Sequence, residues 1–118
     1  QIAPLPIVVI GAGPAGLLAA TRAAERGRQV ILLEKASKAG VKILVSGGTR
    51  CNVANRADRS ETMALFGHAA RFLRPAFHTL FRDEILELLK SEGVPTKLEQ
   101  TGKYFPCSSG THCSRTEN

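Results

Sequence analysis

The chain has 118 residues, of which 43% are hydrophobic and 22% charged, the composition of one globular domain rather than of a disordered or collagen-like chain. Its net charge of +6 arises within residues 21–56, which hold eight Lys and Arg against two Glu. Such a basic segment suits a polyphosphate ligand or a nucleic acid. However, five Phe, one Tyr and no Trp argue against a base-stacking surface, and we expect no nucleic-acid partner.

The N-terminal segment predicts a β-strand. Residues 5–10 form an apolar, β-branched run, and we expect a parallel strand buried on both faces. Gly and Pro interrupt the apolar segment and charges begin at Arg22, so it predicts neither a membrane span nor a signal peptide. The three cysteines form no even disulfide framework, and we expect a cytoplasmic protein without a membrane partner.

A Rossmann-like βαβ unit is predicted over residues 5–34. The first strand runs into the sequence GAGPAG at residues 11–16, a G-x-G-x-x-G pattern. Residues 17–26 suit a helix that ends at Gly27 in a left-handed conformation, and residues 29–33 form a second apolar strand. Two parallel strands joined by a right-handed helical crossover are the expected α/β assembly.

The residue types of this unit fit a dinucleotide. Gly11 permits the tight turn out of the strand, Gly13 lets a pyrophosphate approach the backbone, and Gly16 lets the helix pack closely. The positive end of the helix dipole then faces the phosphates. Glu34, at the end of the second strand, accepts hydrogen bonds from ribose hydroxyls and repels a 2′-phosphate. Both FAD and NAD use this fingerprint, and the alternative is a glycine turn in an unrelated α/β protein.

This unit resembles the FAD domain of glutathione-reductase-like flavoproteins, which favours FAD over NAD. The resemblance is carried by the sequence VIGAGPAGL at residues 9–17 and by the pair Glu34-Lys35. Thiol–disulfide flavoenzymes of that kind carry a C-x₄-C pair, whereas here Cys51 is followed five positions later by Arg56. We therefore expect no redox-active disulfide and interpret Cys51 as a packed or cofactor-contacting thiol.

Residues 35–56 predict a long loop. Its glycines supply permissive backbone, while Lys42 and Arg50 bring cations towards the phosphates. We expect this loop to cover a second face of the pyrophosphate and to reach towards the flavin. A basic surface loop without a ligand is the alternative.

The same stretch resembles one bacterial family. Residues 42–55, KILVSGGTRCNVAN, are similar to the K-I-L-x-S-G-G-G-R-C-N-x-T-N motif of NAD(P)/FAD-dependent oxidoreductases of the BaiN and YhiN type. Gly93-Val94, Glu99 and the sequence GKYFP at residues 102–106 resemble a further segment of that family, and the match spans residues 6–109. Three positions depart from the usual residue: Val41 stands for Arg, Thr49 for Gly and Ala54 for Thr. Thr49 restricts the backbone where the family tolerates a positive φ.

The resemblance implies the FAD-binding part of an oxidoreductase in which NAD(P)H reduces the flavin. The flavin would then pass hydride to a small unsaturated organic substrate or electrons to oxygen. No catalytic acid or base can be named and no metal site is expected. The residues expected to bind the cofactor are Gly11, Gly13, Ala15, Gly16, Glu34, Lys35, Lys42, Thr49, Arg50 and Cys51. The alternative is a truncated, non-catalytic flavoprotein remnant with at most nucleotide binding.

The remainder predicts a helical segment over residues 60–93 and a β-hairpin over 94–106. Within the helical segment Pro75 is expected to interrupt the first helix, Asp83 to cap a later one and Gly93 to end it.

The tail over residues 107–118 has no apolar periodicity, and its Cys107, His112 and Cys113 match no zinc template. Since the resembling family continues with an apolar helix, the tail suggests truncation or a change of reading frame. Residues 1–118 thus predict the N-terminal part of an FAD-binding domain.

Overall fold

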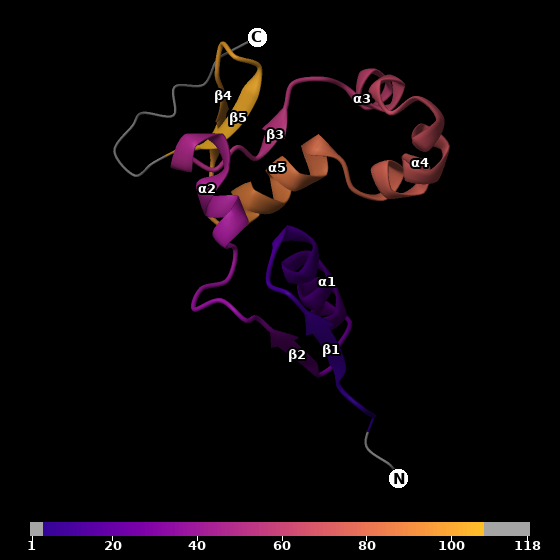
Figure 1. The fold of residues 1–118 in the computed structure, drawn as a ribbon, viewed down its shortest axis with the longest axis vertical. Coiled ribbons are helices and arrows are strands. Elements are labelled where there is room, and N and C mark those ends of the chain that lie inside the picture. The colour runs from indigo at the N-terminus through magenta and orange to yellow at the C-terminus, as the bar shows by residue number, and fades with distance from the viewer. Residues whose placement is uncertain (1–3, 108–118) are drawn as a thin grey trace. The chain divides into compact units, whose positions relative to one another are not determined.

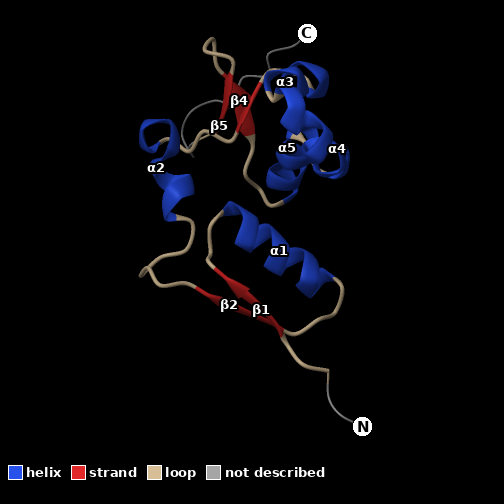
Figure 2. Cartoon of the chain, turned by 45° about the vertical axis from the view of Figure 1, so that its right-hand side comes forward, coloured by secondary structure: helices blue, strands red, loops and turns tan. Residues whose placement is uncertain are grey.

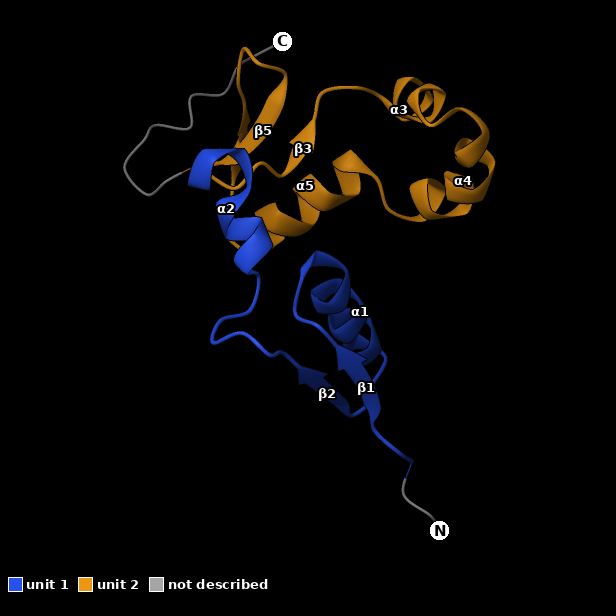
Figure 3. Cartoon of the chain, viewed as in Figure 1, with its two compact units in different colours: residues 1–49 blue, residues 50–118 orange. Residues whose placement is uncertain are grey.

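The computed structural model describes residues 4–107 of the chain (Figure 1). The predicted tail beyond residue 107, with His112 and Cys113, lies outside these residues. The chain divides into two compact units, residues 1–49 and residues 50–118 (Figure 3). Each unit has a small sheet of its own, parallel in the first unit and antiparallel in the second.

The first unit contains the predicted βαβ arrangement. Strand β1 (Ile7–Ile10) leads into helix α1 (Pro14–Glu25), and strand β2 (Val30–Leu33) pairs in parallel with β1 along its whole length. Figure 2 shows α1 lying alongside the two strands. Gly27 follows α1 with φ +74°, the predicted left-handed end of the helix. The Rossmann-like α/β class is confirmed.

Only one face of this parallel sheet is covered. Val9 lies next to Gly16 of α1, and it is half-buried together with Leu32, its partner on β2. The side chains of the other face are exposed: Val8 by 52%, Ile10 by 85%, Ile31 by 42% and Leu33 by 49%. The prediction of strands buried on both faces is therefore wrong. Burying both faces of a strand takes a packing layer on each side, and here α1 covers only the face that carries Val9.

A short helix stands where the sequence predicts a loop. Helix α2 (Val41–Thr49) begins directly after Gly40, whose carbonyl accepts hydrogen bonds from Ile43 and Leu44 at 2.9 and 3.1 Å. Regular helical geometry ends at Ser46 (ψ 150°), and a left-handed turn follows over residues 47–49. The β-branched residues of this helix have low helix propensity, which explains why the sequence pattern does not reveal it.

The second unit combines helices with a three-stranded antiparallel sheet. Its elements are β3 (Ala54–Asn55), α3 (Arg59–Leu65), a 3₁₀ turn (Gly67–Ala69), α4 (Ala70–Thr79), α5 (Arg82–Ser91), β4 (Thr96–Leu98) and β5 (Lys103–Pro106). The strand order is β3-β5-β4, so β5 is central, and β4 and β5 form the predicted hairpin. The predicted helical segment and hairpin are confirmed.

Two helix boundaries differ from the predictions. Pro75 lies inside α4 and does not end it. Proline removes only one backbone donor, and the helix continues beyond it, as the hydrogen bond from the Leu80 N–H to the Ala76 carbonyl at 2.9 Å shows. Helix α5 begins at Arg82, one residue before Asp83, because the Phe81 N–H is capped by the Glu84 carboxylate at 2.9 Å.

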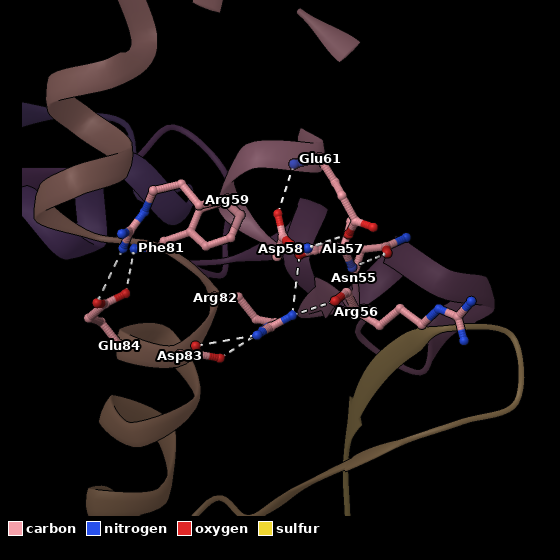
Figure 4. A network of polar contacts seen from close by, with 10 residues as sticks. All are labelled: Asn55, Arg56, Ala57, Asp58, Arg59, Glu61, Phe81, Arg82, Asp83 and Glu84. Atoms are coloured by element: carbon pink, nitrogen blue, oxygen red, sulfur yellow. Dashed lines mark hydrogen bonds and ion pairs between the residues drawn. The ribbon is translucent and has the colours of Figure 1, made fainter. Parts of the chain in front are cut away.

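Polar contacts fix the entry into the helices of the second unit (Figure 4). Asp58 and Glu61 form a reciprocal capping box at the start of α3, with both hydrogen bonds at 2.8 Å. Arg82 donates to the carbonyls of Arg56 and Ala57 and also pairs with Asp83 at 2.7 Å, so it ties α5 to the segment before α3. Gly93 follows α5 with φ +76°, which confirms the predicted end of that helix.

Among residues 4–107 the buried apolar side chains are Ala12, at 1% exposure in the first unit, and Phe105, at 3% in the second. Within residues 4–107 no helix has both the length and the apolar character that crossing a membrane requires.

Candidate cofactor site

A cleft of about 760 Å³ opens at the carboxyl ends of β1 and β2, within the first unit. Residues 10–13 form one wall, from the end of β1 into the glycine turn, and residues 33–36 form another at the end of β2. Lys38, Val41 and Lys42 complete the lining. Open α/β sheets bind their ligands at this edge, where the chain leaves one strand for a helix.

The three glycines of the turn are required for three different reasons. Gly11 has φ +96°, a conformation that side chains disfavour. A Cβ at Gly16 would lie 1.8 Å from the Gly11 carbonyl oxygen, so close packing of α1 excludes one. Gly13 has φ −79°, and a Cβ there would meet no atom of the chain within 4 Å. Neither the backbone nor internal packing explains Gly13, but a ligand that approaches the backbone there does.

The N-terminus of α1 presents backbone donors that no side chain caps in the described part of the chain. Its N-cap residue is Gly13, which has no side chain to accept a hydrogen bond, and Pro14 occupies the first helical position. The N–H groups of Ala15 and Gly16 therefore lack a cap from this residue, and they lie at the positive end of the helix dipole. This combination suits a phosphate or pyrophosphate group.

Glu34 stands at the end of β2 with both carboxylate oxygens engaged. Oε1 accepts a hydrogen bond from the Ala36 N–H and Oε2 one from the Ala12 N–H, each at 2.8 Å. These backbone bonds, Ala36 first and Ala12 second, lower the pKa of Glu34 below its ordinary value. Each oxygen keeps a further lone pair, so an ionised Glu34 can still accept hydrogen bonds from ribose hydroxyls.

Three lysines surround the cleft. Lys35, Lys38 and Lys42 are exposed and line it, and none of them forms an ion pair with another residue in the range 4–107. Against them the lining carries a single carboxylate, Glu34. The balance of charge is therefore positive and suits a polyphosphate, and the residues present fit the ADP half of FAD.

The remaining predicted contacts lie outside the cleft lining. Thr49 ends the first unit with φ +70°, so it adopts the positive φ that a glycine would favour. Arg50 belongs to the second unit, where its Nη1 lies 2.9 and 3.1 Å from the Glu99 oxygens and its guanidinium 4.1 Å from the centre of the Phe105 ring. Cys51 is half-buried with φ +62°. A role for these three in cofactor binding stays a prediction.

Sequence reasoning missed two residues of the site. Both backbone polar groups of Ala12 are hydrogen-bonded. Its N–H donates to Glu34 and its carbonyl accepts from the Gly40 N–H, each at 2.8 Å. Gly40 is buried and has φ +70°. Ala12 is a variable position of the glycine motif and Gly40 looked like one more loop glycine, so no signal in the sequence distinguished either residue.

Comparison with known proteins identifies the family of this chain. Residues 5–114 match the family described as HI0933-like protein Rossmann domain. The chain is 32% identical over 98 residues to a ribosomal RNA dihydrouridine synthase of Escherichia coli, covering 83% of this chain and 24% of that protein. It is 35% identical over 104 residues to a 3-dehydro-bile acid delta(4,6)-reductase of Clostridium scindens, with 86% and 25% covered.

A shorter match, 52% over 42 residues, relates it to a urocanate reductase of Eggerthella lenta, with 36% of this chain and 7% of that protein covered. The chain spans about a quarter of the length of the relatives that match most of it. It belongs to the HI0933-like family of FAD-binding Rossmann domains, to which the BaiN and YhiN type of flavin oxidoreductase belongs.

Proposed function

We propose that this chain holds the ADP half of FAD in a flavoprotein that uses NAD(P)H to reduce a small unsaturated organic substrate. The observation that carries the proposal is Gly13, whose missing side chain leaves open space beside the free N–H groups of α1. Glu34 lies across the same cleft and is suited to the ribose.

Each group at the cleft has one task in this proposal. The Gly13 backbone and the α1 N-terminus receive the pyrophosphate, and Lys35, Lys38 and Lys42 supply positive charge around it. Glu34 accepts hydrogen bonds from the ribose hydroxyls and disfavours a 2′-phosphate by charge repulsion. FAD, when bound, supplies the hydride chemistry, while the protein positions it.

The relatives support the reductive direction of this chemistry. The bile acid and urocanate enzymes are named reductases, and the Escherichia coli relative is named a dihydrouridine synthase. The two reductase names support the reaction type, whereas the three names share no substrate, since one of them specifies ribosomal RNA. We therefore take only the reaction type from the relatives, and the small-molecule substrate that we propose for the whole protein rests on the resemblance to the BaiN and YhiN type.

Flavin binding is tested by mixing the chain with FAD, desalting it and recording the absorption spectrum. Retained bands near about 370 and 450 nm, the signature of oxidised flavin, are the expected result. A colourless protein would refute the proposal. The variant Glu34→Arg should lose these bands, whereas Glu25→Arg, which reverses a charge on the far end of α1, should keep them.

Anaerobic addition of NADPH or NADH to the coloured protein then distinguishes a flavin oxidoreductase from a non-catalytic nucleotide-binding remnant. Bleaching near about 450 nm shows that the flavin is reducible by the nicotinamide. Stable colour together with tight binding would instead favour the non-catalytic alternative, a nucleotide-binding remnant.

A further inference from the structure

The glycine turn is held in place from two sides by a part of the chain that does not belong to the glycine motif. Ala12 is 1% exposed, and its N–H donates to Oε2 of Glu34, which lies 22 residues further along the chain. Its carbonyl accepts a hydrogen bond from the Gly40 N–H at 2.8 Å. Both backbone groups of one peptide position are thus satisfied by the segment that follows β2.

The geometry of Gly40 makes this second bond possible. Gly40 has φ +70°, which glycine adopts freely and other residues adopt at a cost. A Cβ added there would lie 3.6 Å from Cδ1 of Ile43 and 3.9 Å from Cδ1 of Leu17, so space is available and conformation is the constraint. Gly40 does not line the cleft and therefore has no direct part in holding a ligand.

Glu34 provides the second contact that holds Ala12 in place. Its carboxylate bonds at once to Ala36, two residues away, and to Ala12 on the glycine turn. The first bond fixes the direction in which the chain leaves β2, and the second fixes the turn that leaves β1.

We propose that Glu34 and Gly40 are positioning residues that pre-form the glycine turn at Ala12 before the cofactor binds. The inference rests on the proposed function for its consequence, since a pre-formed turn lowers the cost of ordering the backbone around a pyrophosphate. It also gives Glu34 a second task besides contact with the ribose. Gly40 acts only through Ala12.

The direct test is amide hydrogen exchange at Ala12, measured by NMR on the chain in the absence of FAD. In Glu34→Ala the carboxylate is absent, so the Ala12 N–H and the Ala36 N–H both lose their acceptor. Exchange of the Ala12 N–H should accelerate by at least about tenfold. The control is Glu25→Ala, which removes an equal charge from an exposed pair with Arg22 and should leave Ala12 exchange unchanged.

The second test measures FAD affinity in Gly40→Ala by titration of flavin fluorescence. Gly27→Ala is the matched control, because Gly27 has φ +74° and lies at the other end of α1. Both variants should lower the melting temperature similarly, since both force alanine into a left-handed conformation. Only Gly40→Ala should raise the dissociation constant for FAD, by about tenfold.

The outcomes separate this inference from the proposed function. A wild-type chain that binds no FAD refutes the proposed function, while hydrogen exchange at Ala12 still tests whether Glu34 holds the glycine turn in place. Unchanged Ala12 exchange in Glu34→Ala, with FAD bound normally by the wild type, overturns the inference and leaves the function standing. Equal FAD affinities of Gly40→Ala and Gly27→Ala, both folded, would also overturn it.

Discussion

Replacing Gly13 by serine should separate cofactor binding from folding. Gly13 has φ −79° and ψ −175°, which serine adopts without strain, and a Cβ there meets no atom within 4 Å. Serine is also a preferred N-cap, so the free energy of unfolding should stay within about 0.5 kcal/mol of the wild type or rise. The new side chain would fill the open space and bond the N–H groups that a pyrophosphate needs. The dissociation constant for FAD should therefore rise at least about tenfold, or about 1.4 kcal/mol.

Gly16→Ala provides the opposite case. Its Cβ would lie 1.8 Å from the Gly11 carbonyl oxygen, a backbone atom that cannot rotate away. The start of helix α1 and the end of strand β1 would have to separate by about 1 Å, which would lower the free energy of unfolding by about 1–3 kcal/mol. Thermal unfolding by circular dichroism and flavin-fluorescence titration should show Gly16→Ala impaired in stability and Gly13→Ser only in binding. A stable Gly13→Ser variant with wild-type affinity would refute the placement of the pyrophosphate.

Three further predictions concern stability. Phe105→Ala should cost about 3–5 kcal/mol because the ring is 3% exposed, whereas Phe72→Ala, at 86% exposure, should change the free energy of unfolding by less than about 0.5 kcal/mol; urea denaturation compares them. Thr49→Gly should raise the melting temperature relative to Thr49→Ala, since only glycine relieves the strain at φ +70°; equal melting temperatures would contradict this. Backbone hydrogen bonds hold the pKa values of Glu34 and Asp58 below their ordinary 4.5 and 3.8. The folded state thus binds protons less readily than the unfolded one, so this stabilisation is complete above the ordinary pKa values and is lost as the pH falls through the lowered ones. The melting temperature should therefore decline from about pH 6 to about pH 3, and a melting temperature that does not change with pH would contradict this.

The first unit was largely predictable from sequence because its signals are local. Short apolar strands, a glycine turn and a glycine-terminated helix follow each other within 30 residues, and each has a short-range physical cause. The left-handed end at Gly27 is an example, since it depends only on the conformational freedom of that residue. The same logic led correctly to Gly93.

What the sequence could not reveal depends on contacts between distant residues. Ala12 is hydrogen-bonded to Glu34, 22 residues away, and to Gly40, 28 residues away. On the Ala12 side both bonds use backbone groups, so its residue type gives no signal of them. Arg50 illustrates the same limit for charge. Its basic side chain suggested a phosphate contact, but its partner in the structure is Glu99, 49 residues further along the chain. Whether strands are buried on both faces likewise depends on which elements pack on them.

The uncovered face of the β1–β2 sheet affects how the chain behaves as a solute. Val8, Ile10, Ile31 and Leu33 form an apolar surface that water wets poorly. A pair of strands is marginal on its own, and exposed strand edges invite pairing between molecules. Self-association at this face should grow with protein concentration, and sedimentation velocity at several dilutions would detect it. Affinity should be measured at the dilute end of that range, because Ile10 and Leu33 also line the cleft and self-association would cover them.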